Sequence, residues 1–347
     1  GKALNWLKSY LNGRSSFVHY SNASSNTALV EAGVPQVSAL GPYLFSMYIA
    51  PLSNVIRSFG INHHQYADDT QLYITVLKDD VLSCVCRLES CINAVHKWLS
   101  QNWLSLNPKK SEAIQFTSGR GKSRVEDIAS IAVSGVRIKP STVVKRLGVT
   151  LDGGLTFDQH IANVCKASYF HIRALRHVRK SLPDDVAKTV ACSIVGSRID
   201  YCNALLVGMS DSNFAKLQRV QNTLARVVLG LRKFEHITPA LIELHWLPVK
   251  QRVTFKLATL TMKTVHSGQP TYLRDLVNAY EPVRTLRSSS QHLLCVGRTR
   301  TVTAARSFRH SSATIWNSLP AEIRDCTAVD NFKRKLKTHL FKLAFAA

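Results

Sequence analysis

The stretch "HHQYADDTQLYI", His63 to Ile74, places two aspartates, Asp68 and Asp69, side by side after an aromatic residue and an alanine. The residues that follow alternate, so that one face of a strand carries Leu72, Ile74 and Val76. The sequence therefore predicts a hairpin with the aspartate pair at its turn. Two neighbouring carboxylates repel each other, and a fold tolerates them if both are solvated or if a divalent cation lies between them.

The chemistry open to this pair depends on the residues around it. Carboxylate oxygens are the usual protein ligands of Mg²⁺. Two such ions, about 3.5 to 4 Å apart, lower the pKa of an attacking hydroxyl group and neutralise a departing pyrophosphate, which is the chemistry of a polymerase. A bare aspartate pair is most often an exposed turn, so the pair alone does not establish a metal site.

The composition points to a nucleic-acid partner. The 347 residues carry a formal net charge of +23, and such an excess of Lys and Arg attracts polyanions. With 45% hydrophobic residues the chain can also bury the cores of two or three domains. Up to Val76 the only basic residues are Lys2, Lys8, Arg14 and Arg57. The two halves of the chain are therefore expected to have different roles.

The eight cysteines are expected to be reduced thiols. An apolar signal-peptide core and an apolar run of membrane length are both missing from the sequence, which favours the nucleus or the cytoplasm and no membrane partner. A zinc site is one interpretation of Cys84, Cys86, Cys91 and His96. These residues lie within a helical pattern and lack the spacing of a zinc finger or knuckle. A packed helix is therefore favoured, and no zinc is expected. The chain begins with Gly1 rather than methionine and is interpreted as a piece of a longer protein, of undetermined oligomeric state.

Periodicity in the first half predicts helices around the aspartate hairpin. A helix is expected over residues 2–12 and a hairpin over residues 16–34, with the polar tip "SNASSNT". After a loop, apolar residues recur with helical spacing from Leu44 to Phe59, with a kink expected at Pro51. A long helix over residues 79–106 carries one apolar seam: Val81, Val85, Leu88, Ile92, Val95 and Leu99. Strand-like runs follow at residues 112–116, 131–135 and 143–152.

The second half has a helical and basic pattern. Thr156 and Gln159 fit a capping box that starts a helix. On this helix a charged stripe lies opposite apolar residues and consists of Lys166, Arg173, Arg176 and Lys180. The stripe is either a solvated face or a surface that binds nucleic-acid phosphates. Further helices are predicted over residues 183–196, 211–230 and 248–267. The last helix contains "FKRKLKTHLF", with Phe332, Leu336, Leu340 and Leu343 on one face, and residues 287–301 are expected to be a flexible or edge segment.

Several motifs together carry a family resemblance. "YADDTQLYI" resembles the motif C hairpin of reverse transcriptases, and "GVPQVSALGPYLFSMYIAPL" resembles their motif B loop and helix, in the form found in non-LTR, LINE-type retrotransposons of the jockey kind. "WLSLNPKKSEAIQF" matches motif D, and "KRLGVTLDGGLTFDQHI" resembles the primer-grip hairpin that leads into the thumb. "SRIDYCNALLVG", "LHWLPVKQRV", "WNSLP" and "FKRKLKTHLF" are similar to the helical region after the thumb.

The resemblance implies an RNA-directed DNA polymerase with Mg²⁺ or Mn²⁺ as cofactor, and with an RNA template, a DNA primer or target and dNTPs as partners. It implies that Asp68 is the main metal ligand and Asp69 its weaker companion. Template and nucleotide contacts are implied for Gly33, Pro35, Gln36, Ser38, Tyr66 and Ala67, and a primer grip for Arg146, Leu147 and Gly148. Lys109 or Lys110 takes the place of a catalytic lysine near the pyrophosphate, with a surface pair after a helix end as the alternative.

Two departures from the family pattern affect these expectations. Val37 follows the motif B glutamine where the family has glycine; if this backbone needs a positive φ, a β-branched side chain costs about 1 to 3 kcal/mol and misplaces Gln36. The family's third catalytic aspartate and its fingers come from residues before this segment, and neither Glu31 nor Asp79 is expected to replace that aspartate. The isolated chain is therefore expected to bind metal poorly and to polymerise little.

Two main hypotheses follow for the function. The chain is either a segment of an RNA-directed DNA polymerase or a non-catalytic nucleic-acid-binding remnant, and a structural or protein-binding role stays open for its C-terminal helices. The expected architecture is α+β. An incomplete polymerase palm with an antiparallel sheet covers residues 1–152, a helical thumb residues 153–234, and a basic helical extension residues 235–347.

Overall fold

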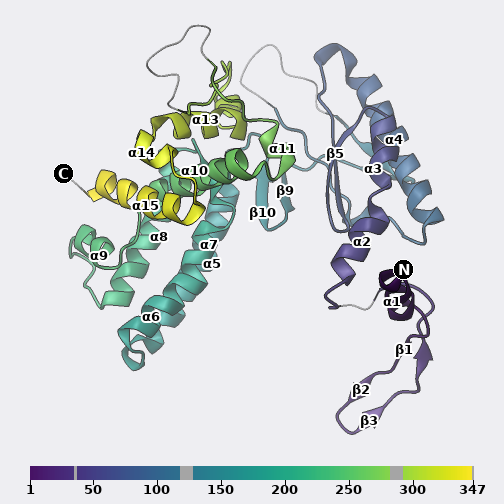
Figure 1. Cartoon of the computed structure of the whole chain (residues 1–347), viewed down its shortest axis with the longest axis horizontal. Coiled ribbons are helices and arrows are strands. Elements are labelled where there is room, and N and C mark those ends of the chain that lie inside the picture. Colours follow the sequence, from purple (N-terminus) through teal and green to yellow (C-terminus); the bar gives the residue numbers. More distant parts are fainter. Residues whose placement is uncertain (35–36, 118–127, 282–291, 346–347) are drawn as a thin grey trace. The chain divides into compact units, whose positions relative to one another are not determined.

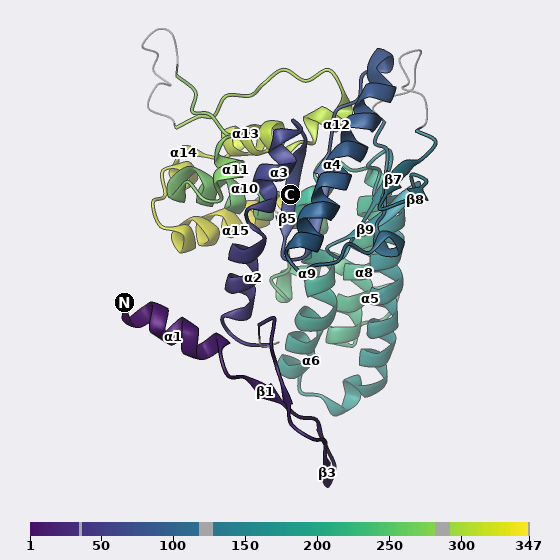
Figure 2. The ribbon, with the colours of Figure 1, turned by 90° about the vertical axis from the view of Figure 1, so that its right-hand side faces the viewer.

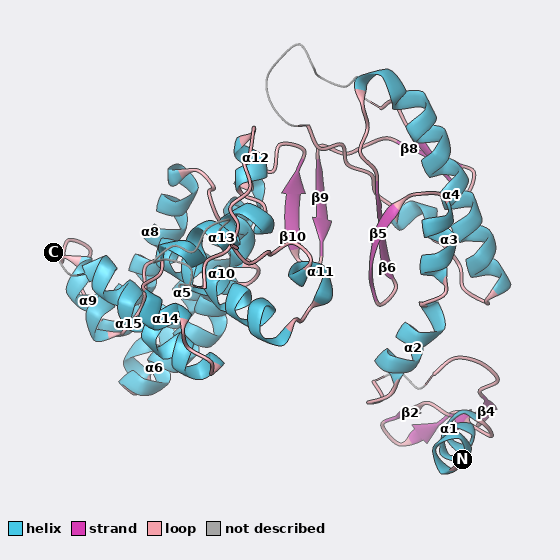
Figure 3. Cartoon of the chain, turned by 45° about the horizontal axis from the view of Figure 1, so that its top comes forward, coloured by secondary structure: helices cyan, strands magenta, loops and turns pink. Residues whose placement is uncertain are grey.

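The computed structural model describes residues 1–34, 37–117, 128–281 and 292–345. Within these residues the fold is mostly helical, and every sheet consists of two antiparallel strands (Figure 3). This mixture confirms the predicted α+β class. The chain divides into two compact units: unit 1 holds residues 1–113 and 125–140, and unit 2 holds residues 114–124 and 141–347.

Unit 1 begins with the predicted helix and hairpin. Helix α1 (Lys2–Leu11) buries none of its side chains. In the hairpin, β1 (Ser15–Ser16) pairs with β4 (Ala28–Leu29), and β2 (His19–Tyr20) pairs with β3 (Ala23–Ser24). The polar tip is therefore only a turn at Ser21 and Asn22, because part of the run "SNASSNT" pairs with the opposite strand.

Pro51 separates two helices rather than kinking one. Helix α2 (Gly41–Ile49) ends before it, and Pro51 is the N-cap of α3 (Leu52–Ser58), where its missing N–H costs nothing. Strands β5 (Asn62–Tyr66) and β6 (Asp69–Tyr73) follow as the predicted aspartate hairpin. Leu72 and Ile74 pack against the core of unit 1, which confirms the apolar face expected for this hairpin.

Helix α4 (Val81–Gln101) supplies much of that core (Figure 1). The core consists of Ile49, Leu52, Ile56, Ile61, Cys91, Val95 and Leu99. The predicted seam is correct for Val95 and Leu99, which are buried, and for Leu88, which packs against the core; Cys84 and Cys91 are buried in addition. Burial raises the pKa of both thiols, as expected for packed cysteines on a helix.

The predicted end of α4 at Leu106 is wrong by five residues. The chain leaves the helix through a Schellman motif, in which Trp103 N–H donates to Ser100 O at 3.3 Å and Leu104 N–H donates to Leu99 O at 2.9 Å. Trp103 occupies the left-handed position with a φ of 56°, which is usually a glycine position. No glycine follows the helix to mark this stop in the sequence.

The strand-like runs were predicted with mixed success. Strands β7 (Ile131–Val133) and β8 (Val136–Ile138) form one hairpin, and β9 (Val143–Arg146) and β10 (Val149–Asp152) form another. The strand expected over residues 112–116 is wrong, because no strand of the described chain pairs with this run. Without a ladder partner its backbone is irregular despite its apolar residues.

Unit 2 opens with a helical bundle built on the β9–β10 hairpin. Helices α5 (Asp158–Val178) and α8 (Asp211–Leu229) run side by side (Figure 2). Their neighbours are α6 (Asp184–Ala191), a π-helical segment (Cys192–Gly196), α7 (Ser197–Asp200) and α9 (Ile237–Glu243). Ile161, Ile172, Leu217 and Leu224 are fully buried between these helices. The helices predicted over residues 183–196 and 211–230 are confirmed.

Helix α10 (Val249–Ser267) contributes to two cores. Val253 lies in the core around α5 and α8, whereas Met262 lies in a second core with Trp316 and Phe332. The elements around that second core are α11 (Thr271–Arg274), α12 (Val302–Ala305), α13 (Phe308–Ser318), α14 (Ala321–Arg324) and α15 (Val329–Phe345). No helix in the described ranges is both long enough and apolar enough to span a membrane.

The apolar face predicted for the last helix is correct except at its end. Phe332, Leu336 and Leu340 are buried on α15, but Leu343 is 65% exposed. The last turn packs instead through Phe341 and Phe345, whose rings lie 4.7 Å apart. In the segment predicted as flexible or edge, residues 287–291 lie outside the described residues, while Leu294 is buried and pairs with Ala279.

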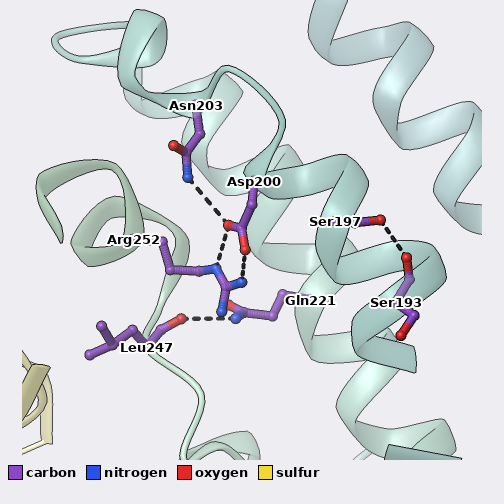
Figure 4. Close-up of polar contacts among 7 residues, drawn as sticks. All are labelled: Ser193, Ser197, Asp200, Asn203, Gln221, Leu247 and Arg252. Carbon is purple, nitrogen blue, oxygen red and sulfur yellow. Dashed lines mark hydrogen bonds and ion pairs between the residues drawn. The ribbon is translucent and has the colours of Figure 1, made fainter. Parts of the chain in front are cut away.

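Polar contacts join the sequence motifs of unit 2 (Figure 4). Arg252, in "LHWLPVKQRV", forms a two-bond ion pair with Asp200, in "SRIDYCNALLVG", and one of these bonds is 2.7 Å long. Asn203 donates to the same carboxylate at 3.2 Å, and Gln221 Nε2 donates to Leu247 O at 2.9 Å. These motif residues therefore connect α7, α8 and α10.

Candidate functional site

The aspartate pair lies at the tip of the β5–β6 hairpin. Tyr66 pairs with Asp69 across a two-residue turn of Ala67 and Asp68, and Ala67 adopts a φ of 52°. Asp68 is exposed and Asp69 is half-buried at the start of β6. Tyr66 is 67% exposed beside them. The turn therefore presents a carboxylate and an aromatic ring at the surface of unit 1.

The base of this hairpin is fixed to α3. Ser53 Oγ donates to Gln65 Oε1 at 2.8 Å and lies 3.0 Å from Nε2 of His63. Since the Ser53 proton is committed to Gln65, Nε2 of His63 must be the donor in the second bond. Burial, together with Arg57 and His64, lowers the pKa of His63, so its ring is neutral near pH 7.

The donor set of the aspartate turn fits a hard cation only in part. Mg²⁺ is commonly held by one or two carboxylates, with waters and substrate phosphates in the rest of its shell. Asp68 and Asp69 can supply that number of ligands. No group of three His, Cys, Asp or Glu side chains able to hold a metal occurs among the residues that the structure describes.

The loop before α2 contains strained backbone. Gly33 has a φ of 82° and accepts a 2.6 Å hydrogen bond on its carbonyl oxygen from Arg14. Val37 has a φ of 60° and is fully exposed, so the positive φ considered for this position is present on a β-branched residue. Ser38 Oγ accepts from the N–H of Gly41, the first residue of α2, at 3.1 Å, while Leu40 is the N-cap of this helix. Pro35 and Gln36 lie outside the described residues.

The two lysines after α4 lie in a short 3₁₀ turn, Pro108–Lys110. The side chain of Asn107 caps this turn by accepting from Lys109 N–H at 3.1 Å. Lys109 and Lys110 are both exposed, and in the described chain neither forms an ion pair with the aspartates. Their assignment near a pyrophosphate stays a prediction.

The predicted primer-grip residues form the turn of the β9–β10 hairpin in unit 2. Leu147 and Gly148 both have positive φ, 44° and 80°, as a type I′ hairpin turn requires. The Tyr201 hydroxyl donates to Leu147 O at 2.6 Å. A Cβ atom at Gly148 would lie 3.1 Å from the Tyr201 ring, so this position needs glycine for both its φ and its space.

The start of α5 differs from the predicted capping box. Gln159 bonds to Asn163 at 3.2 Å and not to the backbone of Thr156, and the N-cap is Phe157, with a φ of 63°. The turn is held instead by Asp152, whose carboxylate accepts from the N–H groups of Gly154, Thr156 and Phe157 at 3.2, 2.8 and 2.7 Å. The sequence signal for this contact was an aspartate directly before two glycines.

The basic stripe of α5 is exposed, as predicted, and its opposite face is buried. Its four members are Lys166, Arg173 and Arg176 on the helix and Lys180 in the turn after it. A surface depression lies along the stripe, lined by Phe170, Arg173, Ala174, Arg176 and His177. Phe170 is 62% exposed, which gives the depression an aromatic face between cations. The stripe therefore retains both interpretations, solvated or phosphate-binding.

We expect unit 2 to lose stability as the pH falls because of His160. This histidine is buried, accepts from Thr150 N–H on Nδ1 at 3.4 Å, and has a pKa lowered by burial. The neutral ring is favoured in the folded state, so its contribution is complete above the unfolded pKa of about 6.5 and is lost as the pH falls through that value toward the folded pKa.

Urea denaturation of the chain and of His160→Gln, between pH 8 and pH 5, measures this contribution. The unfolding free energy of unit 2 should depend less on pH in the variant, which cannot take up the proton. An equally steep pH dependence in both proteins would contradict the assignment to His160.

Comparisons with known proteins agree with these features. Residues 2–151 match the family model described as reverse transcriptase (RNA-dependent DNA polymerase). The chain is a distant relative of the reverse transcriptases. The resemblance to reverse transcriptases predicted from the aspartate hairpin and its neighbouring motifs is thereby confirmed as a distant and partial relationship.

Three polymerases of mobile elements illustrate the relationship. The probable RNA-directed DNA polymerase from transposon BS of Drosophila melanogaster is 29% identical over 234 residues, which cover 64% of this chain and 25% of that protein. The enzyme from mobile element jockey of Drosophila funebris is 28% identical over 46% of this chain and 17% of its own length. The one from transposon X-element of Drosophila melanogaster is 26% identical over 66% and 25%.

The reverse transcriptase match does not cover all the predicted site residues. It includes the aspartate hairpin, the loop before α2, the two lysines and the turn at Leu147, but it ends before α5 begins. The chain spans between 17% and 25% of the length of the three reverse transcriptases described above. No solved structure matches it significantly.

Proposed function

We propose that the chain is a segment of an RNA-directed DNA polymerase of a non-LTR retrotransposon. In this proposal residues 1–152 are part of the palm, residues 153–234 the thumb and residues 235–347 a C-terminal extension. The observation that carries the proposal is the aspartate turn on a fixed hairpin, inside a region related to reverse transcriptases. Its partners are an RNA template, a DNA primer or target and dNTPs.

The proposed chemistry assigns a limited role to this chain's own residues. Asp68 and Asp69 would hold Mg²⁺ or Mn²⁺, and a bound metal ion would lower the pKa of the primer 3′-hydroxyl and neutralise charge on the phosphates. The anchored base of the hairpin keeps the two carboxylates in place while their tip stays accessible. Tyr66 and Ala67 would line the primer end, and Gly33, Pro35, Gln36 and Ser38 the template and nucleotide.

The test is primer extension on an RNA template with Mg²⁺. We compare the 347-residue chain with a restored polymerase, in which the residues that precede the matched region in the jockey polymerase are placed before Gly1. The restored polymerase should extend the primer and the chain alone should not, because the resemblance to reverse transcriptases implies a third catalytic aspartate and fingers that these 347 residues do not supply. Extension by the chain alone would contradict the assignment of a partial site.

A non-catalytic nucleic-acid-binding remnant is the second candidate, and Val37 favours it. A valine at a φ of 60° is strained by about 1 to 3 kcal/mol, and the strain lies in the loop proposed to contact the template. Such strain can shift the loop away from a productive position. A remnant would still bind nucleic acid through its charge of +23.

We expect Val37→Gly to increase primer extension by the restored polymerase. Glycine adopts a positive φ without strain. The gain in stability should be small, because the greater freedom of glycine in the unfolded chain costs about 0.5 to 1 kcal/mol of folding free energy. Val37→Ala is the control, since alanine lacks the β-branch but keeps most of the strain. Primer extension that appears only with Val37→Gly would favour the second candidate, a non-catalytic remnant. Equal extension by the unaltered restored polymerase, Val37→Gly and Val37→Ala would show that Val37 gives no support to that candidate.

A further inference from the structure

The junction between the β9–β10 hairpin and α5 is built from strained backbone. Leu155 and Phe157 have φ values of 52° and 63°, although neither is glycine. Residues other than glycine persist in this region only where their neighbours hold them. Asp152 provides one such hold by accepting from the N–H groups of Thr156 and Phe157.

Arg306 provides a second hold from the C-terminal helices. It follows α12 and lies 151 residues after Leu155 in the chain. Its Nη1 donates to Leu155 O at 2.8 Å, and its Nε donates to Val207 O at 3.1 Å. Its guanidinium carbon lies 5.3 Å from the centre of the Phe157 ring, within the range of a cation–π contact. One planar group thus contacts both strained residues and the loop before α8.

The space around Arg306 is closely filled. Gly208 has a φ of 65°, and a Cβ atom there would lie 2.8 Å from Arg306 Cγ. Burial lowers the pKa of Arg306 and the charge of Asp152 opposes this shift, so the two groups that hold the junction attract each other. A lysine could not replace the arginine, because a single ammonium group cannot match the fork that reaches two separate carbonyls.

We propose that Arg306 is a positioning residue, which braces the junction so that the C-terminal helices fix α5 relative to the β9–β10 hairpin. This inference rests on the proposed function, and it assigns nucleic-acid contacts to the turn of that hairpin, as the predicted primer grip, and to the basic stripe of α5, in its phosphate-binding interpretation. The proposal gives Arg306 no nucleic-acid contact of its own, since its Nε and Nη1 donate to two carbonyls and its guanidinium lies over a ring. The C-terminal helices then contribute to nucleic-acid binding by holding the β9–β10 turn and α5 in place.

Hydrogen exchange of the 347-residue chain tests the brace itself. In Arg306→Lys, amides of residues 153–160 should exchange about tenfold faster, while those inside α8 stay unchanged. Gly208→Ala, which displaces Arg306 from the other side, should give the same local change. Arg309→Ala is the matched control, because it removes an exposed arginine three residues further on. Unchanged exchange at residues 153–160 in both brace variants would overturn the proposal.

Nucleic-acid affinity, measured at several salt concentrations, tests whether the Arg306 brace affects nucleic-acid binding. The probe is an RNA template annealed to a DNA primer. Arg306→Lys should weaken binding about fivefold with an unchanged dependence on salt, because no phosphate contact is lost, whereas Arg173→Ala should reduce the salt slope by about one.

Each other outcome of the binding measurement has a definite meaning. A reduced salt slope in Arg306→Lys would show a direct phosphate contact and overturn the positioning role. Unchanged affinity together with faster exchange at residues 153–160 would overturn the claim that the brace affects nucleic-acid binding. If the unaltered chain shows no salt-dependent binding, the proposed function fails, and the exchange measurement still decides whether the brace exists.

Discussion

Asp68→Ala should reduce primer extension by the restored polymerase at least about a thousandfold. Asp68 lies in an exposed turn at the tip of an anchored hairpin, and it has no ion-pair partner among the described residues that could give it a structural role. Loss of a metal ligand removes several kcal/mol of charge stabilisation in the transition state, and each 1.36 kcal/mol is tenfold in rate. Extension is measured from single-turnover rates with saturating Mg²⁺.

Two further substitutions make this result specific. Asp69→Ala should cost less, because Asp69 is the weaker companion in the proposed site. Asp79→Ala removes an exposed carboxylate from the turn Lys78–Asp80 after the hairpin and should leave the rate unchanged. A rate for Asp68→Ala within tenfold of the unaltered polymerase would exclude this residue as the main metal ligand.

Trp316→Ala should destabilise unit 2 by about 3 to 5 kcal/mol, the usual cost of truncating a fully buried tryptophan. The Trp316 side chain is 1% exposed, and its ring is stacked on Phe332 at 5.8 Å. Its Nε1–H donates to His292 O at 2.8 Å, so the substitution also leaves a carbonyl without its donor. The melting temperature of unit 2 should fall by roughly 10 °C.

Trp103→Ala is the matched control for this prediction. Trp103 is 94% exposed at the end of α4, so its removal should change the melting temperature of unit 1 only slightly. Calorimetry of the three proteins compares the two tryptophans directly. Equal effects of the two substitutions would contradict the description of the segment "WNSLP" as core.

Local periodicity was sufficient to predict most helices and hairpins. The alternation after Asp69 and the helical spacing on α5, α8, α10 and α15 each report a buried face, and those faces are buried in the structure. Three predictions failed because they depended on contacts that the sequence does not display. Trp103 ends α4 without glycine, Asp152 holds the turn before α5 while Gln159 does not complete the capping box with Thr156, and the run 112–116 finds no strand partner.

Only part of the candidate site could be predicted from the sequence. Asp68 and Asp69 were predicted as site residues because their motif resembles a known hairpin; the hairpin is confirmed, and the role of the two aspartates stays a prediction. Tyr201 and Arg306 could not be identified, because their partners Leu147 and Leu155 are remote in sequence and contribute only backbone carbonyls. Contacts to main-chain atoms leave no trace in the residue type of the partner.

Metal-dependent cleavage tests most directly whether the aspartate turn holds the catalytic ion. Fe²⁺ replaces Mg²⁺ in the restored polymerase with its primer, RNA template and dNTP, and the radicals formed with ascorbate and peroxide cut the backbone near the bound ion. We expect cuts within a few residues of Asp68 that disappear in Asp68→Ala. Cuts that lie elsewhere in the chain, or that persist in this variant, would contradict the assignment.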